Sequence, residues 1–217
     1  MNFVTYFICF IILISCILFY LIRNKYDFIS ADDIPNLRSL LNYKNIFRNE
    51  YYSYRNTKNW TSYNDTINDL NALSKMNSND IKNYLNNNNG YLSPFVPAFK
   101  FFWIRLNNVL IEENTIFCPD TTENLLKINN SVNMGIMLIE PGYYYDVSLK
   151  NYNNIIRCYI PFITPYGDSG MKLESNQIVW SEIDDGEDII TFNADAEHSI
   201  WNFAESRVVL IFIDIKI

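Results

Sequence analysis

The chain carries a single histidine in surroundings that favour a role in chemistry. His198 is the only His among the 217 residues, and it lies in segment 192–201, FNADAEHSIW. Arg207 follows at the start of an apolar run. An imidazole near a strand end with a guanidinium behind it is typical of half of a site for a metal and a carboxylate. The alternative is a buried, hydrogen-bonded core histidine, with Arg207 paired to a carboxylate such as Glu205.

Short strands must position these side chains. From residue 134 on, β-rich runs alternate with turns such as Pro141-Gly142 and segment 184–186, DDG. The predicted strands cover residues 134–140, 143–148, 154–163, 170–174, 177–182, 187–192, 198–203 and 206–216. This spacing favours a jelly roll, two packed sheets with a hollow between them. The last run is apolar on both faces, which indicates a central strand with Arg207 pointing into the cavity mouth.

The first half of the chain is expected to be mainly helical. Apolar residues recur at helical spacing over residues 34–54, and further helices are predicted at 66–73, 78–85 and 121–128, with a sheet beginning within 100–112. Helices that precede strands make the fold class α+β. We divide the chain into a membrane anchor (1–25), a linker (26–33) and a domain (34–217) with a helical part (34–99) and a β core (100–217).

Residues 3–22 contain no charged side chain and are long enough to cross a bilayer as a single transmembrane helix. A cleaved signal peptide is less consistent with this run, because it has no basic start and no clear cleavage site. Arg23, Lys25 and Arg38 follow it, so the positive-inside rule predicts a single-pass protein with a cytosolic C-terminal domain. Sequons at Asn59, Asn64 and Asn129 leave a luminal placement open.

The charge and residue composition of the chain limit the partner, the compartment and the source that the sequence predicts. The net charge of −7 and the absence of a long basic run argue against a nucleic-acid partner. Outside the apolar run only Cys118 and Cys158 remain, which agrees with a cytosolic domain, although a disulfide between them stays open. The many Asn, Ile, Tyr and Phe residues are typical of an AT-rich genome, such as that of a protist or a large DNA virus.

Several segments together resemble aspartyl/asparaginyl β-hydroxylases. They are residues 118–126 (CPDTTENLL), 139–142 (IEPG), 156–161 (IRCYIP), 192–201 (FNADAEHSIW) and 207–212 (RVVLIF). The resemblance implies a cupin-like double-stranded β-helix and dependence on Fe(II) and 2-oxoglutarate. It also implies that His198 is a metal ligand and that Arg157 and Arg207 bind the cosubstrate carboxylate. Members hydroxylate Asp or Asn side chains, and some membrane relatives act on lipid.

The chain departs from the family at three positions that face one pocket. Ser148 stands where the first metal histidine is expected, and Tyr159 and Met137 replace a histidine and a serine that contact the cosubstrate in the family. A serine hydroxyl is a poor iron ligand, because non-haem Fe(II) sites usually use two histidines and a carboxylate. Asp146, two residues before Ser148, is the candidate that would restore the metal site together with His198.

Two hypotheses follow from the sequence. The first is a membrane-anchored dioxygenase that hydroxylates a peptide side chain. The second is a catalytically inactive family member that serves as a binding or structural protein at a membrane and needs no cofactor. The three coordinated departures favour the second hypothesis.

Overall fold

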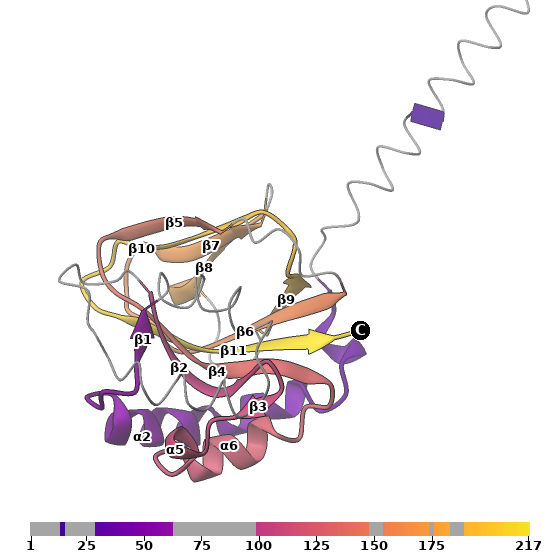
Figure 1. Cartoon of the computed structure of the whole chain (residues 1–217). Coiled ribbons are helices and arrows are strands. Elements are labelled where there is room, and N and C mark those ends of the chain that lie inside the picture. The colour runs from indigo at the N-terminus through magenta and orange to yellow at the C-terminus, as the bar shows by residue number, and fades with distance from the viewer. Residues whose placement is uncertain (1–13, 16–28, 63–98, 148–153, 174–175, 183–188) are drawn as a thin grey trace, which may run out of the picture.

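The computed structural model describes residues 14–15, 29–62, 99–147, 154–173, 176–182 and 189–217 (Figure 1). Most of the predicted anchor, and the predicted helices at 66–73 and 78–85, lie outside the described residues. Within the part of the chain that is described, no helix is both long and apolar enough to cross a bilayer.

The described strands form two antiparallel sheets. The larger sheet has the order β1-β2-β4-β11-β6-β9, with β3 paired to β2, and the smaller sheet has the order β5-β10-β7-β8. The strands are β1 (Thr61–Ser62), β2 (Phe99–Leu106), β3 (Val109–Leu110), β4 (Ser131–Ile139), β5 (Tyr143–Val147), β6 (Ile155–Ile163), β7 (Ser169–Leu173), β8 (Asn176–Val179), β9 (Ile190–Asn193), β10 (His198–Asn202) and β11 (Val208–Lys216). Each of the eight strands predicted from residue 134 on has a counterpart among these, but the one predicted at 177–182 ends at Val179, and residues 180–182 form a 3-10 helix.

The chain passes repeatedly from one sheet to the other. It runs from β4 to β5, back to β6, across to β7 and β8, and then through β9, β10 and β11 in alternate sheets. Figure 1 shows the smaller sheet above the larger one. This arrangement is the predicted jelly-roll sandwich, and it encloses an interior between the two sheets.

Helices cover the outer face of the larger sheet (Figure 1). They are η2 (Ala31–Asp33), η3 (Arg38–Tyr43), α2 (Lys44–Tyr54), α5 (Glu112–Thr115) and α6 (Pro119–Leu125). A further short helix, η4 (Trp180–Glu182), follows β8 and packs Trp180 into the sandwich interior. The Glu50 carboxylate on α2 accepts hydrogen bonds at 2.9 and 2.7 Å from the backbone N–H groups of Asp120 and Thr121, which begin α6. Glu50 therefore satisfies donors that have no partner within α6 and joins the two helices. The α+β fold class is confirmed.

Alternating residues of the larger sheet serve two separate apolar layers. On β11, Val209, Ile211 and Ile213 pack toward the helices, whereas Leu210 and Phe212 pack into the sandwich interior. The strand is paired with β4 on one side and β6 on the other. This confirms that it is a central strand buried on both faces, so the side of the sheet on which each polar residue lies decides what it can contact.

Candidate functional site

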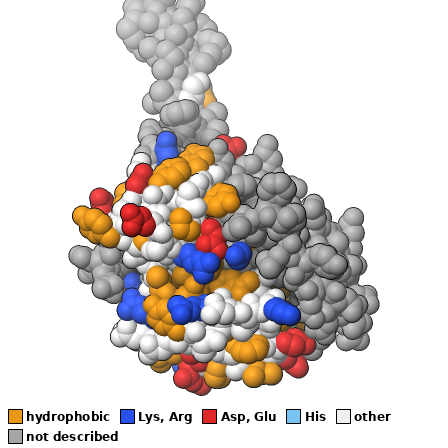
Figure 2. Space-filling model, turned by 90° about the vertical axis from the view of Figure 1, so that its left-hand side faces the viewer, with side chains coloured by type: hydrophobic (Ala, Val, Ile, Leu, Met, Phe, Trp, Pro, Cys, Tyr) orange, Lys and Arg blue, Asp and Glu red, His pale blue; other side chains and the backbone are white. Residues whose placement is uncertain are grey.

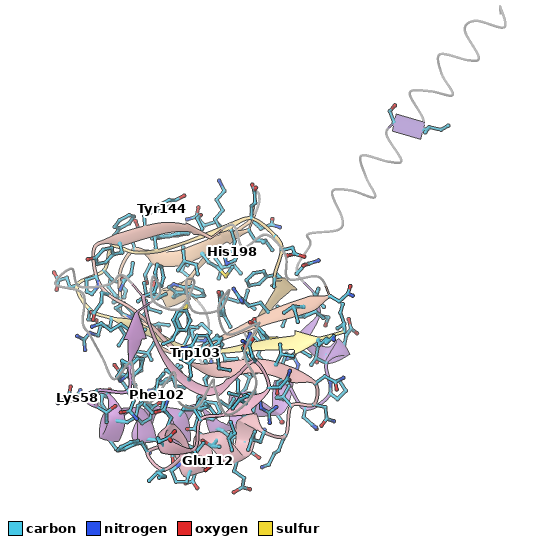
Figure 3. The ribbon with its side chains drawn as sticks, in the orientation of Figure 1. Lys58, Phe102, Trp103, Glu112, Tyr144 and His198 are labelled. Atoms are coloured by element: carbon cyan, nitrogen blue, oxygen red, sulfur yellow. The ribbon has the colours of Figure 1, made fainter. Side chains whose placement is uncertain are left out.

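His198 opens β10 and points into the sandwich interior (Figure 3). Only 4% of the residue is exposed, and its ring packs against Phe192 and Tyr159 at centroid distances of 4.7 and 6.4 Å. A short turn between β9 and β10 sets this position, because the Ala196 N–H donates to the carbonyl oxygen of Asn193 at 2.9 Å.

The hydrogen bonds of His198 define its tautomer. The ring Nδ1 lies 2.9 Å from the carbonyl oxygen of Ala196, which can only accept, so Nδ1 carries the proton and donates. Nε2 is buried and has no hydrogen-bond partner among the described residues. Burial lowers the pKa of His198 to about 4, the Ala196 carbonyl opposes that shift, and the charge of Arg157 adds to it. The imidazole is therefore neutral at pH 7, with the Nε2 lone pair unused, which is the state that a metal-binding histidine requires.

Arg157 lies on the same interior side but is already engaged. Its Nε and Nη2 donate to the two carboxylate oxygens of Asp214 at 2.7 and 2.9 Å, and Asn133 Nδ2 donates to Asp214 at 3.0 Å. These three residues, the inner triad, come from β6, β11 and β4, and all three are less than 9% exposed. The guanidinium fork is thus bidentate on a buried carboxylate of this chain.

Arg207 lies on the opposite side of the larger sheet. Its Nε donates to Glu140 at 2.8 Å, and Lys100 Nζ donates to the other Glu140 oxygen at 2.9 Å. The guanidinium also lies beside the Tyr51 hydroxyl on α2, where it offsets part of the rise that burial causes in the pKa of Tyr51. The neighbouring residue that packs into the interior is Val208. The structure therefore brings Arg157, but not Arg207, to His198.

Asp146 lies in β5, next to β10. The register sets it opposite Ser199, whereas His198 is opposite Val147. In this backbone register Asp146 and His198 are therefore not directly opposed. Ser148 lies outside the described residues.

The interior around His198 is mainly aromatic and aliphatic. Met137 and Tyr159, at the two positions of expected cosubstrate contacts, are buried in the interior layer with Phe192 and Val208. The described residues contain no group of three or more His, Cys, Asp or Glu side chains that could hold a metal ion. His198 Nε2 suits an iron ligand, but one nitrogen is well short of the about three ligands that a non-haem Fe(II) site needs. The described donor set therefore does not fit that ion.

Sequence reasoning missed Asp214 and Asn133, the partners of Arg157. Asp214 carried a usable signal, because it is the one carboxylate in the otherwise apolar run of β11 before Lys216. A charge on a strand buried on both faces requires a partner. Asn133 has no comparable signal, because Asn is frequent throughout the chain.

Comparison with known proteins agrees with this architecture. The family profile described as Aspartyl/Asparaginyl beta-hydroxylase matches residues 32–216. The chain belongs to the aspartyl/asparaginyl β-hydroxylase family. The match includes both the helices over the larger sheet and the whole sandwich, so the resemblance found in the sequence is confirmed at the level of the family.

Individual relatives of this β-hydroxylase family member are distant. An ornithine lipid ester-linked acyl 2-hydroxylase from Rhizobium tropici is 27% identical over 118 residues, which are 54% of this chain and 41% of that protein. The chain thus spans less than half the length of this relative.

Two solved structures show limited similarity to the chain. A predicted oxalate decarboxylase from Thermotoga maritima is 16% identical, with a TM-score of 0.32, over 41% of this chain and 70% of its own. The DMSP lyase DddQ from Ruegeria pomeroyi is 9% identical, with a TM-score of 0.35, over 58% of this chain and 51% of its own. Scores this low add nothing to the assignment, which rests on the family match and on the sheet topology.

Proposed function

We propose that this β-hydroxylase family member is a membrane-tethered binding protein that does not catalyse 2-oxoglutarate-dependent hydroxylation. The observation that carries the proposal is the state of Arg157, the one candidate cosubstrate-binding arginine on the His198 side of the sheet. Its fork is bidentate on Asp214, which is 1% exposed. The inner triad therefore presents no uncompensated positive charge to a ligand.

Charge and polarity support the same conclusion. 2-Oxoglutarate carries two carboxylates, and burying it requires cationic or polar partners for both. Met137, Tyr159 and Val208 line the interior where such partners are expected. Arg207 is held on the helix-covered side by Glu140, at 2.8 Å. If a carboxylate of 2-oxoglutarate displaced Asp214 from Arg157, one of these two buried carboxylates would be left without a cation.

A second candidate is an Fe(II)- and 2-oxoglutarate-dependent hydroxylase. The observation that favours it is the unpartnered Nε2 of His198, a neutral imidazole with its Nδ1 proton fixed on the Ala196 carbonyl. The relative from Rhizobium tropici is described as a lipid acyl hydroxylase, so a membrane lipid joins a peptide side chain as a candidate substrate class. Further ligands for such a site would have to come from Asp146, Ser148 or the substrate.

The membrane tether is part of the proposal. It is supported by the uncharged run of residues 3–22 and by the basic residues Arg23 and Lys25 after it. These residues favour a cytosolic domain. A peptide or lipid presented at the membrane is the partner class, and the net charge of −7 argues against nucleic acid.

Turnover by the full chain in detergent separates the two candidates. We expect no conversion of 2-oxoglutarate to succinate above the level of His198→Ala when Fe(II) and ascorbate are supplied. Calorimetry should likewise detect no saturable 2-oxoglutarate binding. Turnover that is present in the wild type and lost in His198→Ala would reject the binding-protein proposal and establish the hydroxylase.

A further inference from the structure

The start of the described domain is fastened to an edge strand. The Ile29 N–H donates to the carbonyl oxygen of Thr191 at 2.8 Å, and the Thr191 hydroxyl donates to the Ile29 carbonyl oxygen. Thr191 lies on β9, the last strand of the larger sheet, so Ile29 occupies hydrogen-bonding groups that an edge strand otherwise exposes. The Ile29 side chain also packs against the apolar layer beneath the helices. We call this Ile29–Thr191 pairing the clip.

The clip lies at the end of the sandwich that contains His198. The next residue of β9, Phe192, packs its ring against the imidazole at a centroid distance of 4.7 Å. At this end β10 and β6 begin and β11 finishes, with Asn193 opposite Ile156 and Lys216 opposite Ile155. We call it the His198 end. In Figure 1 β9 lies at the same end of the domain as the C-terminus.

The clip shortens the link between the domain and the tether. The uncharged run finishes at residue 22, so seven residues reach Ile29. A fully extended chain of that length spans at most about 25 Å. If the link instead ran to Leu37, on the far side of η2, its maximum length would roughly double. A short link attached at one end of a domain restricts which end can face the bilayer.

We propose that the clip holds the His198 end against the bilayer, so that the partner of this end is a lipid surface. The inference rests on the membrane tether of the proposed function and names the surface that the sandwich presents to it. Ligands that reach the His198 end would then come from the membrane plane and not from bulk solution.

The opposite end of the sandwich provides the alternative. Exposed aromatic residues gather there on β5 and on the turns before β7 and after β10: Tyr144 is 54% exposed, Tyr166 99% and Phe203 55%. Figure 2 shows the side of the molecule that carries this end, where hydrophobic side chains lie among Lys and Arg. If the clip did not orient the domain, this aromatic end would be the competing lipid contact.

Fluorescence quenching in vesicles tests the orientation. Single reporter cysteines at Lys216→Cys, at the His198 end, and Tyr166→Cys, at the other end, would be labelled in full-length protein that carries Cys9→Ser and Cys16→Ser. Cys118 and Cys158 are buried and free, so they remain. With nitroxide-headgroup phosphatidylcholine as quencher, we expect several-fold stronger quenching at position 216 than at position 166.

Variants of the clip connect that difference to its cause. Ile29→Pro removes the donating N–H, and Thr191→Val removes the hydroxyl at nearly constant volume. Together they should bring the quenching ratio close to one. Thr115→Val is the matched control, because it removes a hydroxyl–carbonyl bond to Glu112 far from the clip and should leave the ratio unchanged.

The outcomes separate the inference from the proposal beneath it. Protein that fails to float with vesicles would reject the tether and therefore the proposed function. Protein that floats but is quenched equally at both positions, or more strongly at position 166, would overturn the orientation alone. A ratio that persists in the double variant, with an unchanged circular dichroism spectrum, would show that the clip is not its cause.

Discussion

Each side of the larger sheet carries a buried carboxylate that accepts hydrogen bonds from an arginine, but the surroundings of the two carboxylates differ. On the interior side, Asn133, Asp214 and Arg157 form the inner triad, and the Asp214 side chain is 2% exposed. On the helix-covered side, Lys100, Glu140 and Arg207 form a second cluster, the rim triad, in which the Arg207 side chain is 46% exposed. Each triad centres on one carboxylate that accepts from an arginine. They differ in how much water reaches them and in their third member, which is a neutral asparagine in the inner triad and a lysine in the rim triad.

These differences decide which triad could offer a positive charge to a ligand. Water screens the rim triad, and its two cations exceed its single carboxylate, so it retains a net positive charge near the surface. The inner triad is buried within the sandwich, and it is neutral overall because its one cation pairs with its one anion. The interior that would receive a dicarboxylate cosubstrate therefore offers it no free cation among the described residues.

Breaking the inner triad should have the largest effect. Asp214→Ala leaves Arg157 buried without its counter-ion, and removal of one partner of a buried pair costs about 3–5 kcal/mol. We expect a decrease of about 4 kcal/mol in the free energy of unfolding, measured by urea denaturation of the detergent-solubilised chain.

Two variants control for the loss of volume and for the loss of charge. Asp214→Asn keeps an oxygen acceptor and should lose less than Asp214→Ala. The double variant Arg157→Met/Asp214→Leu removes both charges and should recover most of the loss, because apolar replacement of a buried pair is often neutral. A double variant as unstable as Asp214→Ala would show that packing, not the unpaired charge, dominates.

The neutral His198 should make stability depend on pH. Burial lowers its pKa from 6.5 to about 4, so between these values the unfolded chain binds a proton that the folded chain does not. Stability from this residue is complete above pH 6.5 and falls as pH decreases toward 4, by about 3 kcal/mol for a shift of this size. In metal-free buffer, His198→Gln should reduce the slope of unfolding free energy against pH in this window. An unchanged slope would mean that the imidazole is already charged in the folded protein.

The fold was predictable because its signals are local. Turn residues such as Pro141-Gly142 separate the β-rich runs, and these turns mark where the eight strands begin and end. The long apolar run of β11 correctly identified a central strand. Residues 38–54 were correctly predicted as helical, although their first part, η3, is a 3-10 helix.

The partners in the site were not predictable because they depend on register. Arg157 and Asp214 are 57 positions apart and meet only because β6 and β11 pair at that rung. Arg207 and Val208 are neighbours, but a shift of one residue moves a side chain to the other face of a sheet. Sequence spacing alone could not decide which of the two enters the interior.

The smallest expected loss of stability is at the rim triad, and it tests whether solvent access separates the two triads. Burial alone would raise the pKa of Glu140, but hydrogen bonds from Arg207 and Lys100 outweigh it, and the pKa lies below its usual value. Glu140 therefore adds stability above the pKa of an unfolded glutamate, and this is lost as pH falls through the folded pKa. Because Arg207 is half exposed, we expect Glu140→Ala to cost only about 1–2 kcal/mol at pH 7.

Arg38→Ala, which breaks an exposed ion pair with Asp32, is the matched surface control and should cost less than about 0.5 kcal/mol. Urea denaturation at pH 7 and at pH 3.5 measures both, and the Glu140→Ala deficit should shrink at the lower pH. If Glu140→Ala were as damaging as Asp214→Ala, solvent access would not be what separates the two triads.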